Sequence, residues 1–276
     1  MAGRITWFRT GGTADLSHGD ETMTVGVLYK YGMLGEYSEA LFSTPSVWFA
    51  SPASLNDPFE CRPWFTFEGS ERDIVTRLAR GLHQQEPHLS PDEAMARAFG
   101  IYREGRHRNP ETWEGMRTGL LSALADNIGI YCLSATNDSI LMWSHYADEH
   151  RGYCLGFEAG DTTPFFGAAQ EVRYSDTYPV VDVFTTTTSD QVDLVFLTKF
   201  TGWSYESEYR IIDHESGPGL HSYPAELLRS VTFGFRMPES DRTKIREWVG
   251  RRGHPVKFFE AVRDDRQFKI DVREIA

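Results

Sequence analysis

The sequence is short of cysteine, and the few cysteines it has do not form a framework. The 276 residues contain three, Cys61, Cys132 and Cys154, with no Cys-x-x-Cys spacing. A sparse and odd set in a chain of this length indicates free thiols kept in a reducing compartment. We therefore expect a cytoplasmic protein without disulfide bonds.

Long apolar runs and an excess of positive charge are also missing. No stretch approaches the roughly 18 consecutive apolar residues of a membrane-spanning helix, and residues 1–20 contain no apolar core of signal-peptide length. Lys and Arg number 28 against 40 Asp and Glu, which gives a net charge of −12. Such a charge repels phosphate at long range, so we expect no membrane partner and no broad coating of nucleic acid.

Several familiar catalytic signatures are absent as well. The chain has no Gly-x-Ser-x-Gly, no Walker loop, no Gly-x-Gly-x-x-Gly and no His-Glu-x-x-His. Its nine histidines are dispersed without the spacing of metal ligands. The sequence therefore predicts no metal site.

What the chain does have is an ordinary globular composition, with 40% hydrophobic and 13% aromatic residues. Residues 1–22 show no periodicity and predict a flexible N-terminal segment. Residues 23–276 are near the upper end of the length that forms one domain. We expect a single domain over that range.

Strand-like segments surround a helical block at about residues 71–127. Within this block Ser90 is followed by Pro91 and by Glu93, the signature of a capped helix start. Strands around one inserted group of helices predict an α+β fold with a mixed or mostly antiparallel sheet. The strand-like segments are residues 24–31, 46–50, 129–134, 152–157, 171–174, 209–212, 230–235, 255–259 and 267–272.

A first polar group lies on the opening strand and the loop after the second. Lys30 follows the aromatic Tyr29 on a strand and is a candidate for binding an anionic group. Asn56 and Asp57 are short polar residues in a loop that also contains Ser51. Such side chains either bond backbone groups of the turn or face a cleft. Both interpretations stay open.

A second group lies in residues 137–146, with the sequence NDSILMWSHY. His145 has the charge that changes nearest neutral pH, and Tyr146 can donate a hydrogen bond or stack on a flat ligand. On a helix the two side chains point in different directions. The alternative is that Trp143 and Tyr146 belong to the core and that His145 is a buried, hydrogen-bonded histidine.

A third group lies in residues 203–210, with the sequence WSYESEYR. If the segment is extended, Glu206, Glu208 and Arg210 share one face. With two carboxylates roughly 6.5–7 Å apart, one can orient a substrate while the other activates it. The arginine can lower the pKa of both carboxylates or bind an anion. A solvated strand edge with a local ion pair is the alternative.

These three groups, in this order, resemble domain-of-unknown-function family 2971. That family comprises bacterial and phage-borne proteins, some of them associated with phage defence. The resemblance extends over about residues 27–272. The segments that carry it are residues 28–31, 49–52, 56–59, 132–134, 142–146, 152–157 and 203–210.

The opening pattern is also similar to the first two strands of ADP-ribosyltransferases, especially those acting on nucleic acids. This resemblance implies an ADP-ribosyltransferase-like core that uses NAD and needs no metal. It implies that Lys30 binds the nicotinamide ribose or its phosphates, and that Ser134 or Tyr146 supports the nicotinamide ring. It also implies that Glu208, with Glu206 in Glu-x-Glu spacing, holds the ribose and activates the acceptor.

The leading hypothesis is thus an NAD-dependent ADP-ribosyltransferase-like effector that modifies nucleic acid or protein in a bacterial defence or toxin setting. One alternative is an acid–base hydrolase or nuclease, with or without a metal, built on Asp57, Glu60, His145 and Glu208. Another is a non-enzymatic module that senses a ligand. The candidate catalytic residues are Glu208, Glu206, Tyr146 and His145, and the candidate NAD-binding residues are Lys30, Tyr31, Ser51, Asn56, Asp57, Ser134, Trp143 and Arg210.

Overall fold

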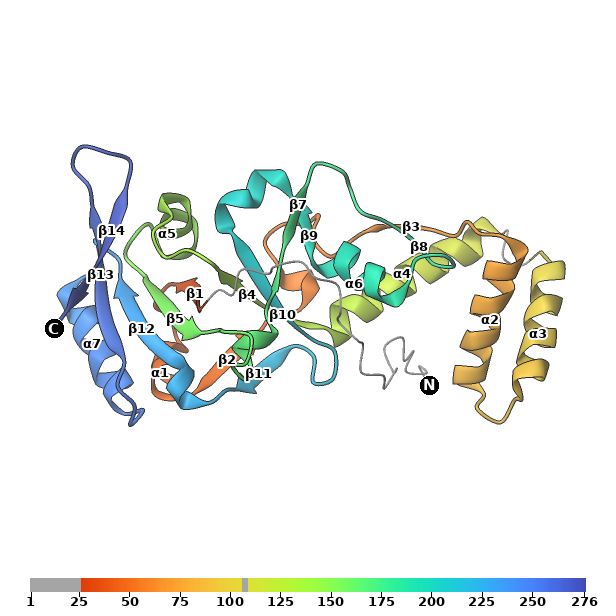
Figure 1. Ribbon diagram of the computed structural model, residues 1–276, viewed down its shortest axis with the longest axis horizontal. Helices are drawn as coiled ribbons and strands as arrows, with labels where there is room; N and C mark the ends of the chain where they lie inside the picture. The colour runs from red at the N-terminus through yellow and green to blue at the C-terminus, as the bar shows by residue number, and fades with distance from the viewer. Residues whose placement is uncertain (1–25, 106–108) are drawn as a thin grey trace.

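The computed structural model describes residues 26–105 and 109–276 (Figure 1). The N-terminal segment expected at residues 1–22 lies outside these ranges. A long sheet forms the middle of the molecule, with a helical hairpin at one end and the helix α7 at the other (Figure 1). Within the described ranges, no helix is long and apolar enough to cross a membrane.

Eight strands make the main sheet, in the order β14-β13-β12-β5-β1-β4-β10-β6. Neighbouring strands are antiparallel except for β12 and β13, which are parallel. A parallel pair needs a crossover, and α7 (Glu239–Gly250) supplies it. The strands are β1 (Val27–Gly32), β4 (Gly129–Ser134), β5 (Tyr153–Glu158), β6 (Gln170–Glu171), β10 (Glu208–Asp213), β12 (Leu228–Phe233), β13 (Lys257–Arg263) and β14 (Ile270–Ile275).

Three short strand pairs flank this sheet. They are β2 (Ser46–Phe49) with β11 (Gly219–Ser222), β3 (Trp64–Thr66) with β8 (Val180–Asp182), and β7 (Arg173–Ser175) with β9 (Thr198–Phe200). The first pair is antiparallel and the other two are parallel. The predicted α+β fold with a mixed, mostly antiparallel sheet is confirmed. The ADP-ribosyltransferase-like core stays a prediction.

The helical block consists of α2 (Glu71–Gln85), α3 (Pro91–Arg103) and α4 (Pro110–Asn127). Ser90 caps α3 as its sequence indicates, because its side chain accepts the Glu93 N–H while the Glu93 carboxylate accepts the Ser90 N–H at 2.9 Å. The hairpin of α2 and α3 packs on itself through a small buried cluster, Val75, Ala79, Ala94 and Ala98. The remaining helical elements are α1 (Ser38–Ser43), α5 (Ile140–Tyr146), α6 (Thr188–Phe196), η1 (Pro52–Ser54), η3 (Phe166–Ala168), η4 (Thr201–Glu206) and η5 (Ala225–Leu227).

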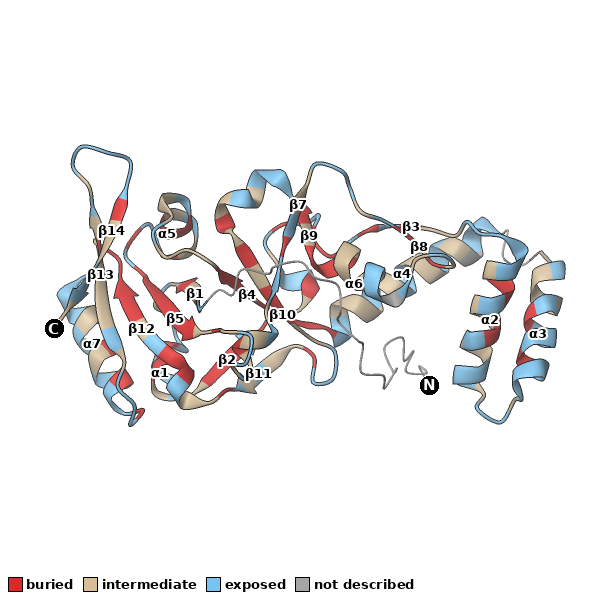
Figure 2. Ribbon diagram, viewed as in Figure 1, coloured by how far each residue is buried: buried red, intermediate tan, exposed pale blue. Residues whose placement is uncertain are grey.

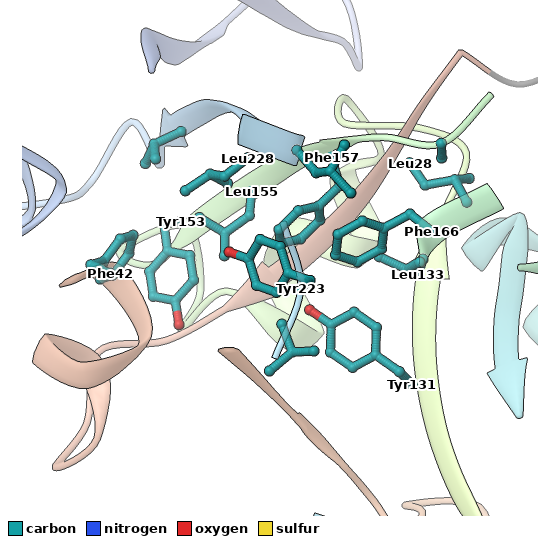
Figure 3. Packing of buried hydrophobic residues seen from close by; sticks show 14 of the residues in the cluster. Leu28, Phe42, Tyr131, Leu133, Tyr153, Leu155, Phe157, Phe166, Tyr223 and Leu228 are labelled. Carbon is teal, nitrogen blue, oxygen red and sulfur yellow. The ribbon is translucent and has the colours of Figure 1, made fainter. Parts of the chain in front are cut away.

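The central strands of the sheet are largely buried (Figure 2), and the two faces of the sheet contribute to different clusters. Leu28 of β1 and Leu155 of β5 belong to the large core, in which the rings of Phe157 and Phe166 stack at 4.3 Å (Figure 3). Tyr31 belongs to a smaller cluster with Trp143 of α5 on the opposite face. Covering on both faces explains the continuous apolar run of β5. Because both faces of the sheet are covered, polar side chains on the neighbouring strands are buried as well.

Candidate functional site

A buried group of five charged side chains lies where β9, η4 and β10 meet the loop before β3. We call it the charged cluster, and its members are Glu60, Lys199, Glu206, Glu208 and Arg210. Their exposed fractions are 5%, 4%, 4%, 3% and 0%. Charges are almost never fully buried unless they are paired, so the partners of each member decide what the cluster does.

Lys199 is the centre of the charged cluster because its ammonium group contacts three carboxylates. The Nζ atom lies 2.8 Å from Glu60 Oε1, 2.5 Å from Glu206 Oε2 and 2.9 Å from Glu208 Oε2. The contacts with Glu206 and Glu208 are hydrogen bonds. The contact with Glu60 has the distance of an ion pair but not the direction of a hydrogen bond. One cation thereby holds Glu60 of the loop before β3 together with two carboxylates of the segment 206–208.

Arg210 closes the other side of the charged cluster with a fork of hydrogen bonds. Its Nε donates to Glu208 Oε1 at 2.7 Å and its Nη2 donates to Glu208 Oε2 at 2.9 Å. Nη2 also donates to Glu60 Oε2 at 2.5 Å, and Nη1 donates to the Phe196 carbonyl at 2.8 Å. A bidentate guanidinium–carboxylate pair of this kind fixes the orientation of both groups.

The charged cluster holds three carboxylates against two cations and so carries one excess negative charge. Burial raises the pKa of Glu208, but the charge and hydrogen bonds of Arg210, followed by the charge of Lys199, outweigh it and bring this pKa to about 2. Burial lowers the pKa of Lys199, and the charges of Glu208, Glu60 and Glu206 more than reverse this and raise it. Glu208 and Lys199 are therefore both ionised at neutral pH.

The segment before β10 is not extended as its sequence suggested. Residues Thr201–Glu206 form η4, a 3-10 helix, and Ser207 follows with a left-handed φ of 43°. Ser134 Oγ holds this turn by donating to the Glu206 carbonyl at 2.6 Å. The expectation that Glu206 and Glu208 line one strand face is wrong, because the turn brings Glu206 to Lys199 from a second direction.

Tyr146 joins the charged cluster to the surface. Its hydroxyl donates to Glu206 Oε1 at 2.5 Å and accepts from Asn56 Nδ2 at 3.1 Å. Asn56 is exposed and Tyr146 is partly exposed. Burial raises the pKa of Tyr146, and the hydrogen bond to Glu206 raises it further, so the phenol keeps its proton. Asn56, Tyr146 and Glu206 thus form a line of contacts from solvent to buried carboxylate.

Strand register decides which side chains share the face of Glu208. Ser134 of β4 pairs with Glu208 on one side and with Tyr29 of β1 on the other. Directly opposed residues of antiparallel strands point to the same face, so Tyr29, Ser134 and Glu208 form one row. Lys30 is next to Tyr29 and therefore points to the other face. Its Nζ donates to the Cys132 carbonyl at 2.8 Å, so the structure does not bring Lys30 to Glu208.

Two of the aromatic candidates are core residues. Trp143 is fully buried, with its Nε1 donating to the Asn137 carbonyl at 2.8 Å. Tyr31 packs edge-on against Trp143 at 5.3 Å, and its hydroxyl donates to the Thr136 carbonyl at 2.9 Å. Neither side chain contributes an open surface on which a flat ligand can stack.

The remaining candidates surround the charged cluster without joining it. His145 is exposed, and its ring lies 6.5 Å from that of Tyr146 and 6.1 Å from that of Tyr205. Asp57 is buried and accepts the Phe59 N–H at 2.9 Å, so it holds the loop together. Ser51 is partly buried at the start of η1, where its carbonyl accepts the Ser54 N–H.

A small pocket borders the charged cluster on the side of Glu60 and Lys199. Its volume is about 80 Å³, and Phe59, Tyr178 and Phe200 are exposed around it. Pockets for drug-sized ligands typically measure about 300–1,000 Å³. A small head group fits this pocket as it stands, whereas a dinucleotide needs the surrounding side chains to move.

The sequence-based site omitted two members of the charged cluster. Glu60 entered only as an acid–base group of the hydrolase alternative, and Lys199 was missed altogether. A signal for Lys199 exists, because it is the one charged residue in the run 195–200, VFLTKF. A lysine inside an apolar run is seldom buried without carboxylate partners. Among the described residues, no group of three or more His, Cys, Asp or Glu side chains is arranged to hold a metal ion.

Comparison with known proteins gives one family match. Residues 142–211 match the family described as Protein of unknown function (DUF2971). The matched segment includes Tyr146 and every member of the charged cluster except Glu60. No curated protein and no solved structure matches the chain. The family resemblance inferred from the sequence motifs is therefore confirmed, over residues 142–211, for DUF2971.

Proposed function

We propose that this chain cleaves the bond between nicotinamide and ribose in NAD and transfers the ADP-ribosyl group to an acceptor. In this reaction the C–N bond breaks and nicotinamide leaves with the electron pair. A nucleophile of the acceptor then bonds to the ribose carbon and releases a proton. Positive, oxocarbenium-like charge develops on the ribose, and a fixed carboxylate stabilises it.

The observation that carries the proposal is the pair of carboxylates held by one lysine on the β10 side of the sheet. Glu206 and Glu208 both bond Lys199, and the charged cluster keeps one excess negative charge. That charge is fixed and buried before any substrate arrives, as electrostatic stabilisation of a transition state requires. The row of Tyr29, Ser134 and Glu208 supports the proposal further, because the resemblance implies a serine and a late glutamate together.

The contacts favour Glu206 as the carboxylate that faces the ribose. Both oxygens of Glu208 accept hydrogen bonds from Arg210, so Glu208 is fully engaged. Glu206 Oε1 instead bonds Tyr146, whose hydroxyl meets the exposed Asn56. When the Tyr146 ring turns aside, this oxygen becomes available to a ligand entering past Asn56. Glu208, Lys199 and Arg210 are then positioning residues that act through Glu206.

The test measures nicotinamide release from NAD by chromatography, with single-stranded DNA, RNA and protein offered as acceptors. Glu206→Gln removes the charge and keeps the shape, and we expect the rate to fall about 100-fold or more. The exposed Glu247→Gln on α7 is the matched control and should react like the unmodified chain. No thermal shift with NAD, together with no nicotinamide release on any acceptor, contradicts the proposal.

One observation favours a second candidate, ligand recognition without catalysis. Each charged side chain of the charged cluster already has an opposite charge beside it, and none is more than 5% exposed. With every charge paired inside the protein, the charged cluster can have a structural role, in which it holds the fold around a binding surface and takes no part in a reaction. A thermal shift with NAD or a related nucleotide, without any nicotinamide release, selects this candidate.

A further inference from the structure

A larger pocket lies at the turn of the β13–β14 hairpin and contains no member of the charged cluster. Its volume is about 460 Å³, within the usual range for small-molecule sites. Residues 263–270 of the hairpin form one wall, and Ile140, His150 and Phe235 form the other. The hairpin rises at the end of the sheet near α5 (Figure 1). The proposed reaction does not use this pocket, and of its lining residues only His150 lies within the DUF2971 match.

Phenyl groups give the pocket its apolar character. Phe235 packs against the His150 ring at 4.5 Å, and Phe268 at the hairpin turn is completely exposed. The uncovered Phe268 ring is therefore free to contact a ligand in the pocket that it lines. Flat rings lining a pocket of this size favour a flat aromatic ligand.

His150 contributes a buried polar atom that has no partner. Its Nε2 lies 3.0 Å from Ser144 Oγ, and Ser144 Oγ donates to the Ile140 carbonyl at 2.8 Å. A carbonyl can only accept, so both contacts are hydrogen bonds only when Nε2 of His150 carries the proton. Burial, followed by the charge of Arg236, lowers the pKa of His150 from its usual 6.5, so the ring is neutral at pH 7. Nδ1 is then a bare acceptor, buried and without a hydrogen bond in the described chain. A ligand N–H that reached Nδ1 would satisfy it.

The backbone holds His150 in place at this pocket. Asp148, Glu149 and His150 all have left-handed φ angles, 45°, 48° and 70°, which non-glycine residues seldom adopt. The His150 carbonyl accepts the Arg236 N–H at 3.0 Å. A Cβ atom on Gly234 would lie 2.1 Å from that carbonyl, so the close approach needs glycine. Backbone strain of this kind persists where the surrounding structure over-determines it.

Charged side chains at the rim of the pocket indicate what a ligand would carry besides a flat aromatic group. Asp265 pairs with Arg263 at 3.0 Å, Lys269 pairs with Asp271, and Asp264 bonds the N–H groups of the turn. Within the part of the chain that the structure describes, the Arg266 guanidinium has no such partner. An unpaired, exposed arginine binds phosphate well because its fork matches two oxygens.

We infer that this pocket binds a nucleotide, with an amino-bearing base between Phe235 and Phe268, its N–H facing His150 Nδ1, and its phosphate on Arg266. Free nucleotides and nucleotides of a single strand share this chemistry. Aromatic stacking on bases with a nearby cation is how single-stranded nucleic acid is commonly held. The inference does not depend on the proposed reaction, because the pocket and the charged cluster have no residue in common.

The test titrates the full chain with AMP, CMP and a single-stranded oligonucleotide, using calorimetry. We expect AMP to bind while ribose 5-phosphate does not, and purine riboside 5′-phosphate, which lacks the amino group, to bind about 10-fold more weakly. Phe268→Ala should weaken binding at least about 5-fold, since stacking is lost. Arg266→Ala should weaken it about 10-fold or more. Arg251→Ala, an exposed arginine on the loop after α7, is the control.

The outcomes separate the inference from the proposed reaction. Tighter binding of the oligonucleotide than of AMP identifies a single strand as the ligand, and equal binding identifies a free nucleotide. Unchanged affinity in Phe268→Ala and Arg266→Ala overturns the inference, as does equal binding of ribose 5-phosphate. Loss of AMP binding in Glu206→Gln also overturns it, because the ligand would then sit at the charged cluster. Nicotinamide release enters none of these comparisons.

Discussion

Replacing Lys199 by methionine tests the electrostatic account of the charged cluster most directly. The change keeps an unbranched side chain one atom shorter and removes the ammonium group that contacts Glu60, Glu206 and Glu208. Removing one partner of a buried ion pair costs about 3–5 kcal/mol. Because three carboxylates lose their shared cation, we expect the free energy of unfolding at pH 7 to fall by about 5 kcal/mol, the upper end of this range.

The pH dependence gives this prediction a sign. The pKa of Glu208 is about 2 in the folded chain against an ordinary value of 4.5. A depressed carboxyl pKa stabilises the fold above pH 4.5 by about 3 kcal/mol, and this contribution is lost as pH falls toward 2. In Lys199→Met the pKa of Glu208 is depressed less, so the variant loses less of this stabilisation in acid. The difference in free energy of unfolding between the variant and the unmodified chain should therefore narrow as the pH falls from 4.5 toward 2.

Guanidinium unfolding followed by tryptophan fluorescence measures both effects. Lys257→Met is the matched control, because Lys257 pairs with Glu274 at 3.1 Å on the surface and such exposed pairs contribute at most about 1 kcal/mol. If Lys199→Met lost no more stability than this control, or if the gap did not narrow in acid, the reasoning would be refuted.

Three further predictions follow from contacts described above. Arg210→Lys keeps the charge but loses the fork to Glu208, and we expect about 2–4 kcal/mol less stability by the same unfolding measurement. Gly234→Ala should lower the melting temperature, since its Cβ would lie 2.1 Å from the His150 carbonyl, whereas Gly250→Ala on α7 meets no atom and should not lower it. Burial raises the pKa of Cys61 to about 12, so iodoacetamide at pH 8 should leave this thiol unmodified until the chain is denatured, as mass spectrometry can show.

The sequence was most informative where local pattern and final structure coincide. Ser90 predicted the start of α3 because a capping box depends only on residues within one helical turn. The apolar run that includes Cys132 gave the bounds of β4 as Gly129–Ser134. Strand order was beyond this reasoning, since a strand pattern does not say that β1 lies between β4 and β5.

The site was harder to predict because its members come from distant segments. Glu206 and Glu208 were recognised as a pair on one face of an extended strand. The 3-10 helix and the left-handed Ser207 between them instead bring the two carboxylates to Lys199 from different directions. Side chains alternate between the two faces along each strand. Comparing Lys30 of β1 with Glu208 of β10 also requires the register of both strands with β4, which the sequence does not give. Lys199 was missed because its partners Glu60 and Glu208 are brought to it by tertiary folding.

The hairpin of α2 and α3 has a consequence for how the chain opens. Its fully buried interface is limited to Val75 and three alanines, and the larger side chains packed around them are only partly buried, which is a small core for two helices of 15 and 13 residues. Local opening requires only the free energy of the contacts that it breaks. In deuterated water the amides of this hairpin should therefore exchange long before those of β5, and the rest of the protein need not unfold for them to do so.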